Sequence, residues 1–564
     1  MHELIEKLIA RLPLDFRVLY RQFLLRVIDL ESLSIQADVT GYLGQFAGVL
    51  IMLSLVHSTV AYLGYTFIPE PAARFAFCLH MEHYLIATTM LVIGLITVIS
   101  WDATFPDRRD VMVLSPLPIA PRTILAAKVT ASAAVLGLGL VTLNVASGVV
   151  IPLLMGAQPG PAWGFFQALP AWWFTIVAAS AFLYGSVLTI QGFTSLLLPR
   201  SHFLRLSAIL QLAAFGLFLG VYFVQPSLTD PAAMADPQNH WILASSPSYW
   251  FFALFNQLNG SLPAQFSWIA ARAWIGLGLA LTGAASSLVL CYIHTMKKTV
   301  EEPDLVPGPV GPHLLPPLGN SLQTAVALFS VRSLTRSRQH RVAFAFYLAF
   351  VFGLAFSLFR SELALPASSL VSMDLVISTF LMMFFAVAGL GSVFSLPISL
   401  TANWVLRTTQ IRPSEKYVAA TRRTLLLLAV LPTWLLAAAL SLRFGPFPNA
   451  AGHLAVLALV GCNAVELCLV GFYKVPFTCS YLPGKANVQV IFWGFLVVML
   501  AVVIPCAEFE LSALHQPLRF FMMLFSLSAA RTALWAQNQR RAKSAVLHFE
   551  ELPDEIITTL GLSA

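Results

Sequence analysis

The sequence predicts an all-α, polytopic membrane protein of about twelve transmembrane helices, arranged as two parallel six-helix pseudo-repeats with interfacial amphipathic helices. Three observations favour this fold class. The 564 residues are 58% hydrophobic and 10% charged, whereas a soluble domain carries about 25% charged residues. Long stretches lack any charged side chain, and short strings recur in the same order in both halves of the chain.

The predicted membrane spans follow from the spacing of Asp, Glu, Lys and Arg, because about 20 apolar residues cross a bilayer. Two candidates each contain one charge: 452–473 contains Glu466, and 518–537 contains Arg531. With the run at 129–199 divided into two spans, the total is about twelve. The charge-free runs are 39–69, 83–101, 129–199, 206–229, 273–296, 342–359, 375–406, 424–442 and 486–507.

Positive charges give these spans an orientation with both termini in the cytoplasm. If twelve spans begin from a cytoplasmic N-terminus, 27 of the 33 Lys and Arg residues fall in cytoplasmic segments, as the positive-inside rule predicts. The net charge of +7 therefore reports topology and indicates no nucleic-acid partner. The N-terminal segment is too charged for a signal peptide, so the first span is expected to act as an uncleaved anchor in a cell (inner) membrane. Arg531 falls in the last span. The other five exceptions flank the predicted outer ends of spans, and they are Arg74, Arg272, Arg360, Arg443 and Arg519.

Each predicted half begins with an amphipathic segment. Phe16, Leu19 and Phe23 share one face of a helix before the first span, which is typical of a helix lying in the membrane interface; packing on a neighbouring domain is the alternative. The Pro- and Gly-rich segment 299–321 predicts a cytoplasmic linker. The expected domains are 1–298, the linker 299–321, and 322–564 with a cytoplasmic C-terminal tail.

Three pairs of short strings indicate that the halves arose by duplication. VLSPLPIAP at 113–121 matches VLRTTQIRP at 405–413 in Val, Leu, Ile and Pro. GFTSLLLPRS at 192–201 matches PFTCSYLPGK at 476–485, and VEEPDL at 300–305 matches FEELPDE at 549–555. The pairs follow the second, fourth and sixth predicted helices of each half. Because six is even, both halves have the same orientation, as in some transporters.

The loop after the second predicted helix forms a Pro-rich elbow with apolar side chains. Pro116, Pro118 and Pro121 prevent a regular helix from running through it, and Pro121 occupies a tolerated position at the start of the next helix. The apolar side chains near them either dock on a partner or fold back on the protein itself. They are Val113, Leu114, Leu117 and Ile119.

This charged stretch, followed by LSPLPIAPRTILAAK and a membrane helix, resembles the permease subunits of type-2 ABC exporters. The resemblance implies a coupling helix that inserts into a groove of a cytoplasmic ATPase, and two ATPase subunits for a chain with both halves. In the second half, Thr408 and Gln410 occupy the positions of Pro116 and Pro118. The implied coupling residues are Leu114, Leu117, Pro118, Ile119, Pro121 and Arg122 in the first half, and Leu406, Arg407, Ile411, Arg412 and Pro413 in the second.

The chain lacks a nucleotide-binding loop of its own. A phosphate-binding loop requires GxxxxGK[ST], but the Gly484–Lys485 pair is followed by Ala486 and preceded by Cys479 where the first glycine would stand. ATP would therefore be held by the partner, and no cofactor is expected in this chain. The six cysteines show no CxxC spacing, and no catalytic or metal-ligating set emerges.

Polar residues within predicted spans form a second candidate site. Glu466, with Asn463 one turn earlier, is costly inside a bilayer and suggests a functional site. The alternative is a structural glutamate, either protonated or paired with an arginine such as Arg531. His57 is expected to make an interhelical hydrogen bond. The segment 246–260 suits a helix in the outer interface, with a substrate gate as the alternative.

The leading functional expectation is the membrane-spanning subunit of an ATP-driven exporter. A twelve-helix secondary transporter is the alternative, although no Asp-Arg-Gly-Arg loop follows the second helix. A membrane enzyme of lipid or glycan metabolism would need clustered acidic residues or histidines on an interfacial loop. The long outside loop offers Asp230, Asp236 and His240 without metal-ligand spacing.

Overall fold

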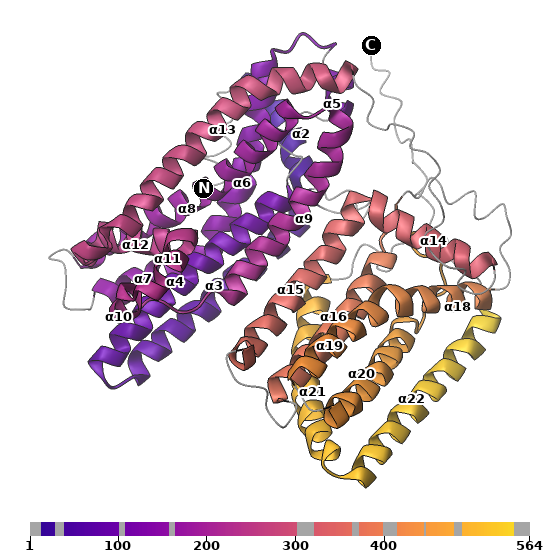
Figure 1. Ribbon diagram of the computed structural model, residues 1–564. Helices are drawn as coiled ribbons and strands as arrows, with labels where there is room; N and C mark the ends of the chain where they lie inside the picture. Colours follow the sequence, from indigo (N-terminus) through magenta and orange to yellow (C-terminus); the bar gives the residue numbers. More distant parts are fainter. Residues whose placement is uncertain are drawn as a thin grey trace. The chain divides into compact units, whose positions relative to one another are not determined.

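The protein is helical throughout the part of the chain that the computed structural model describes, and that part contains no β-strand (Figure 1). The chain divides into two compact units, and the division after Pro309 falls within the 299–321 segment. The described residues are 13–28, 39–100, 108–114, 116–156, 164–301, 321–363, 372–398, 414–444, 447–478, 488–545 and 547.

The first unit contains long helices joined by short helical segments. Several helices start with a proline in the first turn, where its missing N–H costs no hydrogen bond. In order, the elements are α2 (Leu14–Ile28), α3 (Val39–Phe67), α4 (Pro71–Ile99), α5 (Arg108–Leu114), α6 (Pro121–Asn144), α7 (Ser147–Gly156), α8 (Phe165–Leu197), α9 (Arg200–Val224), α10 (Pro231–Ala235), η1 (Pro237–Asn239), α11 (His240–Ser245), α12 (Pro247–Asn259), η2 (Ala264–Phe266) and α13 (Ser267–Glu301).

The second unit is a bundle in which α16 lies at the centre, packed against α15, α19, α20 and α21. One long helix of this bundle is interrupted by a π-helical turn, η4, a feature that widens a helix locally. The elements are α14 (Ser321–Arg336), α15 (Arg338–Leu363), α16 (Met373–Phe394), α18 (Ser414–Leu425), η4 (Leu426–Val430), α19 (Leu431–Phe444), α20 (Phe447–Cys468), α21 (Val488–Leu514) and α22 (Pro517–Ser544).

Within the described residues, eight helices are long and apolar enough to cross a membrane. Two shorter apolar helices, Ile209–Val224 and Ala343–Leu358, occupy positions where the sequence predicts further spans. The prediction of an all-helical protein with several helices long and apolar enough to span a membrane is therefore confirmed. The eight are Phe46–Phe67, Pro71–Ile99, Pro121–Asn144, Phe165–Leu197, Ala264–Leu290, Met373–Phe394, Glu415–Arg443 and Phe447–Cys468.

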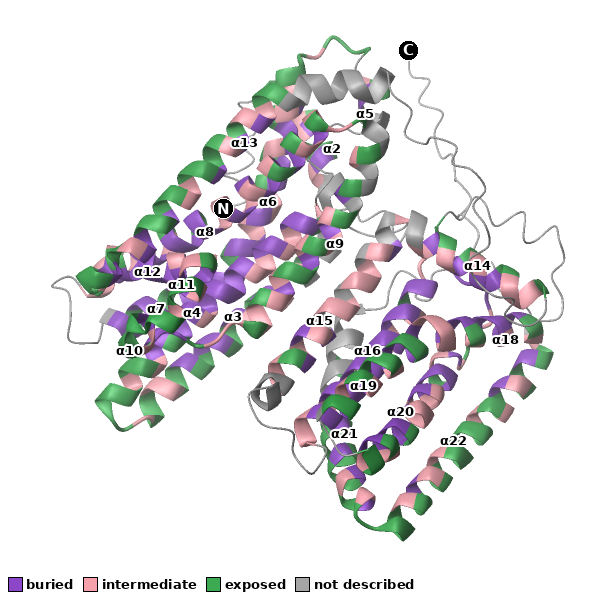
Figure 2. Ribbon diagram, in the orientation of Figure 1, coloured by how far each residue is buried: buried purple, intermediate pink, exposed green. Residues whose placement is uncertain are grey.

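The aromatic segment 246–260 forms part of the core of the first unit, so its apolar side chains face other helices of the protein. Its helix α12 packs against α4, α8 and α13, and Tyr249, Phe251 and Phe255 are fully buried (Figure 2). The Trp172 ring of α8 meets Phe255 edge-on, with 5.3 Å between ring centroids. Because aromatic residues occupy several faces of α12, neighbouring helices cover it on more than one side.

Close helix packing in the first unit depends on small residues. A Cβ added at Gly185 of α8 would stand 2.9 Å from the backbone oxygen of Ala280 on α13. Small residues allow such approach between membrane helices, where dispersion contacts replace the hydrophobic effect. The close approach of α8 to α13 therefore requires a glycine at position 185.

Candidate functional site

The Pro-rich elbow of the first half is a short, hydrogen-bonded turn between α5 and α6. The Leu117 N–H donates to the Leu114 carbonyl at 3.2 Å, and the Ile119 N–H donates to the Leu117 carbonyl at 2.7 Å. Helix α6 then begins at Pro121, and the Thr123 N–H donates to the Ala120 carbonyl at 2.9 Å. These bonds fix the elbow to the end of α6, so that displacing the turn displaces the helix.

The elbow has one packed face and one free apolar face. Leu114 and Ile119 contact the cluster formed by α2 and α6, and Val111 is buried. Met112, Val113 and Leu117 are 58%, 61% and 46% exposed. Leu114 and Ile119 therefore fold back on the protein, whereas the side chains of Val113 and Leu117 are exposed. The remaining implied residues, Pro118, Pro121 and Arg122, are exposed.

Helix α2 supports the elbow from the side. Leu19 and Phe23 are buried against Ile124 and Ala127 of α6, and the Lys128 ammonium lies 5.1 Å from the centre of the Phe23 ring. Such cation–π contacts contribute on the order of 1 kcal/mol. The predicted apolar face thus packs on α6, a helix of the same unit rather than of a neighbouring domain.

The second set of implied coupling residues, Leu406, Arg407, Ile411, Arg412 and Pro413, lies outside the described residues. The start of that loop is described. Its residue Ile398 donates its N–H to the Phe477 carbonyl at 3.1 Å, and the Phe477 N–H donates to the Phe394 carbonyl at 2.8 Å.

Phe477 has φ of 66°, a left-handed conformation that is uncommon for a residue other than glycine. Beside it, the His340 ring bonds to the Leu396 carbonyl at 2.9 Å. Burial lowers the pKa of His340, so the ring is held neutral with its Nε2–H donating to that carbonyl. The beginning of the second loop is therefore fixed at residues 394–398.

Glu466 is a paired glutamate whose partner is Arg422 rather than the suggested Arg531. Arg422 Nε lies 2.6 Å from Glu466 Oε1, and its Nη2 donates to Oε2 at 3.1 Å. Asn538 of α22 donates to the Glu466 backbone carbonyl at 2.8 Å and to Oε2 at 3.0 Å. Asn463 instead donates to the Leu459 and Leu527 carbonyls, at 2.9 and 3.1 Å. Glu466 and Asn463 therefore bind different partners, and both join helices of the second unit.

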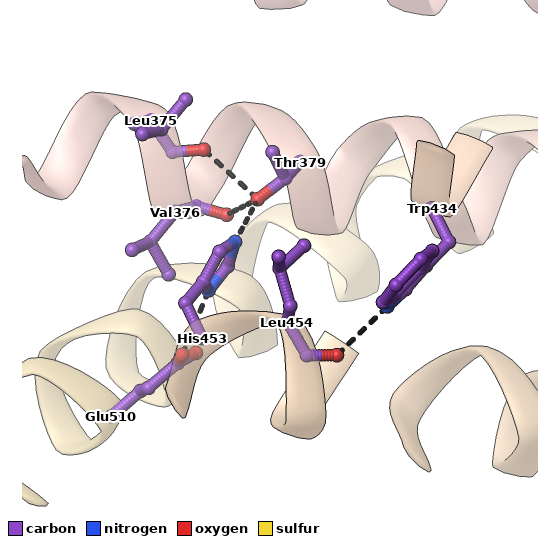
Figure 3. Close-up of polar contacts among 7 residues, drawn as sticks. All are labelled: Leu375, Val376, Thr379, Trp434, His453, Leu454 and Glu510. Carbon is purple, nitrogen blue, oxygen red and sulfur yellow. Dashed lines mark hydrogen bonds and ion pairs between the residues drawn. The ribbon is translucent and has the colours of Figure 1, made fainter. Parts of the chain in front are cut away.

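A buried polar pair that sequence reasoning missed lies between α20 and α21 (Figure 3). His453 Nδ1 is 2.8 Å from Glu510 Oε1, and both side chains are fully buried. Thr379 of α16 contacts the other ring nitrogen, Nε2, at 2.9 Å. The sequence offers a weak signal, a histidine within the candidate span 452–473, but Glu510 lies beyond the charge-free run 486–507 that predicts the neighbouring span.

The first unit also contains a buried carboxylate that sequence reasoning missed. Glu82 of α4 accepts a hydrogen bond from Asn256 of α12 at 3.2 Å. The neighbouring His83 lies 3.1 Å from the Ser248 hydroxyl and stacks on Tyr249, with ring centroids 4.1 Å apart. These contacts tie the buried helix α12 to α4.

His57 makes the interhelical contact that the sequence predicts: its Nε2 lies 3.2 Å from the Tyr84 hydroxyl. No group of three or more His, Cys, Asp or Glu side chains suited to a metal ion occurs among the described residues. No protein-family model, curated protein or solved structure matches this chain.

Proposed function

We propose that this protein is the membrane-spanning subunit of an ATP-driven exporter, and that its elbow at 108–122 docks on a separate cytoplasmic ATPase. One observation carries the proposal: the elbow exposes Met112, Val113 and Leu117 while its other face is anchored. A contiguous exposed apolar surface is typical of a protein contact site. The resemblance of this stretch to type-2 exporter permeases supplies the kind of partner.

The contacts of the elbow suit it to transmit movement. It is bonded to α6 at one end, and α5 packs against α13. A push on Leu117 would therefore reach α6 through the turn and α13 through α5. Packed helices shift between discrete arrangements rather than deforming continuously, so closure of a nucleotide-bound ATPase would tilt these helices as rigid bodies.

The order of helices in the second unit supports a second, equivalent half. There α14 precedes α15 and α16, the stretch 399–413 follows, and α18 through α22 complete the order. We infer twelve spans in two six-helix repeats, two ATPase subunits per chain, and cytoplasmic termini in a cell inner membrane. ATP is bound by the partners, and this chain is a transport subunit rather than an enzyme.

A twelve-helix secondary transporter is the second candidate, and the observation that favours it is the fully buried His453–Glu510 pair. Ionisable groups inside a helical bundle often belong to proton or ion pathways. The two candidates differ in energy source. Transport that stops when ATP is withdrawn, with the proton gradient maintained, favours the exporter.

The proposal is tested by co-expressing the full chain with candidate ATPases from its source and purifying it from membranes. Burying a leucine side chain contributes about 1.5–3 kcal/mol, so Leu117→Asp should weaken ATPase binding roughly 10- to 100-fold. The matched control is Trp241→Asp, which alters an exposed apolar residue of α11, far from α5 in the first unit (Figure 1). Equal ATPase recovery with both variants would overturn the docking assignment.

A further inference from the structure

Hydrogen-bond donors and acceptors around His453 determine where its ring protons lie. The Thr379 hydroxyl is 2.9 Å from each of the Leu375 and Val376 carbonyl oxygens (Figure 3). Carbonyl oxygens only accept, so the single hydroxyl proton points either to one of them or to His453 Nε2. In the first case the threonine oxygen accepts from Nε2–H; in the second, Nδ1 carries the ring hydrogen and donates to an ionised Glu510.

A hydrogen lies between His453 Nδ1 and Glu510 Oε1, because two acceptor atoms cannot approach to 2.8 Å without one. Three forms supply it: a cationic ring with an ionised carboxylate, a neutral ring with a protonated carboxyl group, and a neutral ring donating from Nδ1 to an ionised carboxylate. The first two forms have zero net charge, whereas the third leaves an unpaired charge at a fully buried site, at a cost of several kcal/mol.

Comparison with Glu466 distinguishes the two forms. Glu466 faces Arg422, whose charge is permanent, and both of its carboxylate oxygens have partners. Glu510 Oε2 has no hydrogen-bond partner among the described residues. Its neighbour is a histidine, a residue type that is readily neutral near pH 7, whereas an arginine stays cationic. A buried ion pair needs additional hydrogen bonds to offset desolvation, so the neutral form is favoured for Glu510.

The elements around the pair add few groups that could compete for this proton. Helix α16 contributes the Thr379 hydroxyl, and the α19 indole of Trp434 donates to the Leu454 carbonyl at 2.9 Å. Leu514 and Phe520 close over Gly452, next to His453. Cys506 lies one helical turn before Glu510 on α21. Ionisable side chains near the same ends of α16, α19, α21 and α22 are Asp374, Arg443, Glu508 and Arg519, with His515 between α21 and α22.

We propose that His453 and Glu510 form a proton-binding site in which Glu510 carries the proton while α16, α20 and α21 are packed together, and releases it when the pair is exposed to water. A glutamate in water has a pKa of about 4.3, so wetting the site at neutral pH releases about one proton. Separation of these helices is therefore linked to pH: each unit of rising pH favours the separated form about tenfold. This inference does not depend on docking of an ATPase.

The experiment uses the purified full-length chain in nanodiscs and its Glu510→Gln variant. Glutamine cannot ionise, and its amide can still donate to His453 Nδ1. Subtracting the infrared spectrum of the variant from that of the wild type at neutral pH should show a protonated carboxyl band. SDS-induced unfolding between about pH 5 and pH 8 should become more favourable for the wild type than for the variant, by about tenfold per pH unit.

Two further variants keep the test decisive. Glu466→Gln should remove an ionised carboxylate band and leave the pH slope of unfolding unchanged. His453→Gln should retain the protonated carboxyl band at a shifted frequency, because the glutamine carbonyl accepts from Glu510; this variant replaces Glu510→Gln if the latter misfolds. An ionised carboxylate band for Glu510, or equal pH slopes for the wild type and Glu510→Gln, would overturn the proposal.

Discussion

The Arg422–Glu466 pair gives a prediction whose size can be estimated from the structure. The pair joins α18 to α20, and Asn538 adds a bond from α22. Glu466→Leu would leave the Arg422 guanidinium, whose side chain is 13% exposed, without its carboxylate. Breaking a buried ion pair by removing one partner costs about 3–5 kcal/mol. We expect a loss of this size in the free energy of unfolding.

Removing both charges should cost much less than removing one. In the double variant Arg422→Met with Glu466→Leu, no charge is left without a partner, and well-packed apolar replacements of buried ion pairs are often close to neutral. The double-variant cycle should therefore give a coupling free energy of about 2–4 kcal/mol, larger than the values usual for distant residues.

The assay is reversible SDS unfolding of the full chain, followed by helical circular dichroism. Additive losses in the double variant would refute the ion-pair account. If Glu466→Leu abolished transport but left the free energy of unfolding unchanged, Glu466 would belong to a substrate path, the other role that the sequence suggests. Glu466→Gln, which keeps a partner for Asn538, should fall between the wild type and Glu466→Leu.

Three further variants test individual packing and titration arguments. Gly185→Ala should destabilise the first unit by about 1–3 kcal/mol because its Cβ would press on Ala280; Gly137→Ala, which meets no atom within 4 Å, is the control in the same unfolding assay. Burial lowers the pKa of His340, so the unfolded chain binds more protons than the folded chain below about pH 6.5, and stability should decrease as the pH is lowered. In a pH series of melting temperatures, His340→Gln should reduce this decrease. Phe477→Gly should be less destabilising than Phe477→Ala by about 1 kcal/mol, because alanine retains the cost of a left-handed backbone; the reverse order would show that no such strain exists.

Local composition predicted the helical membrane class and the position of the elbow. Charge-free runs are a property of single segments, so the eight long apolar helices could be anticipated without knowing how they pack. The prolines around Leu117 likewise predict a break between helices. The sequence could not assign separate faces to the elbow, because that depends on contacts with α2, which begins 94 residues before Arg108.

The partner of Glu466 and the burial of Glu510 could not be predicted from the sequence, because both depend on contacts between residues far apart in the chain. Glu466 lies 44 residues from Arg422, and Arg531 was an equally reasonable partner by charge alone. Glu508 ends the charge-free run 486–507, where the sequence predicts the end of a span, yet α21 continues to Leu514. Helix α21 can bury that glutamate because His453 lies opposite it.

The paired strings at 192–201 and 476–485 differ in local structure. Phe193 lies inside α8, whereas α20 ends at Cys468 and Phe477 lies in a left-handed turn. Similar letters therefore do not fix similar backbones here, because Phe477 also bonds to Phe394 and Ile398. The segments that contain these two strings therefore differ in backbone structure, whether or not the halves share an ancestor.

The central claim is that the elbow transmits the action of an ATPase to the membrane helices. The most direct measurement is ATP hydrolysis by the purified complex, reconstituted in lipid, with the wild-type chain, Leu117→Asp or Trp241→Asp. The account predicts that Leu117→Asp removes the stimulation of ATP turnover by the membrane subunit, while Trp241→Asp retains it. Full stimulation in the Leu117→Asp complex would contradict the claim.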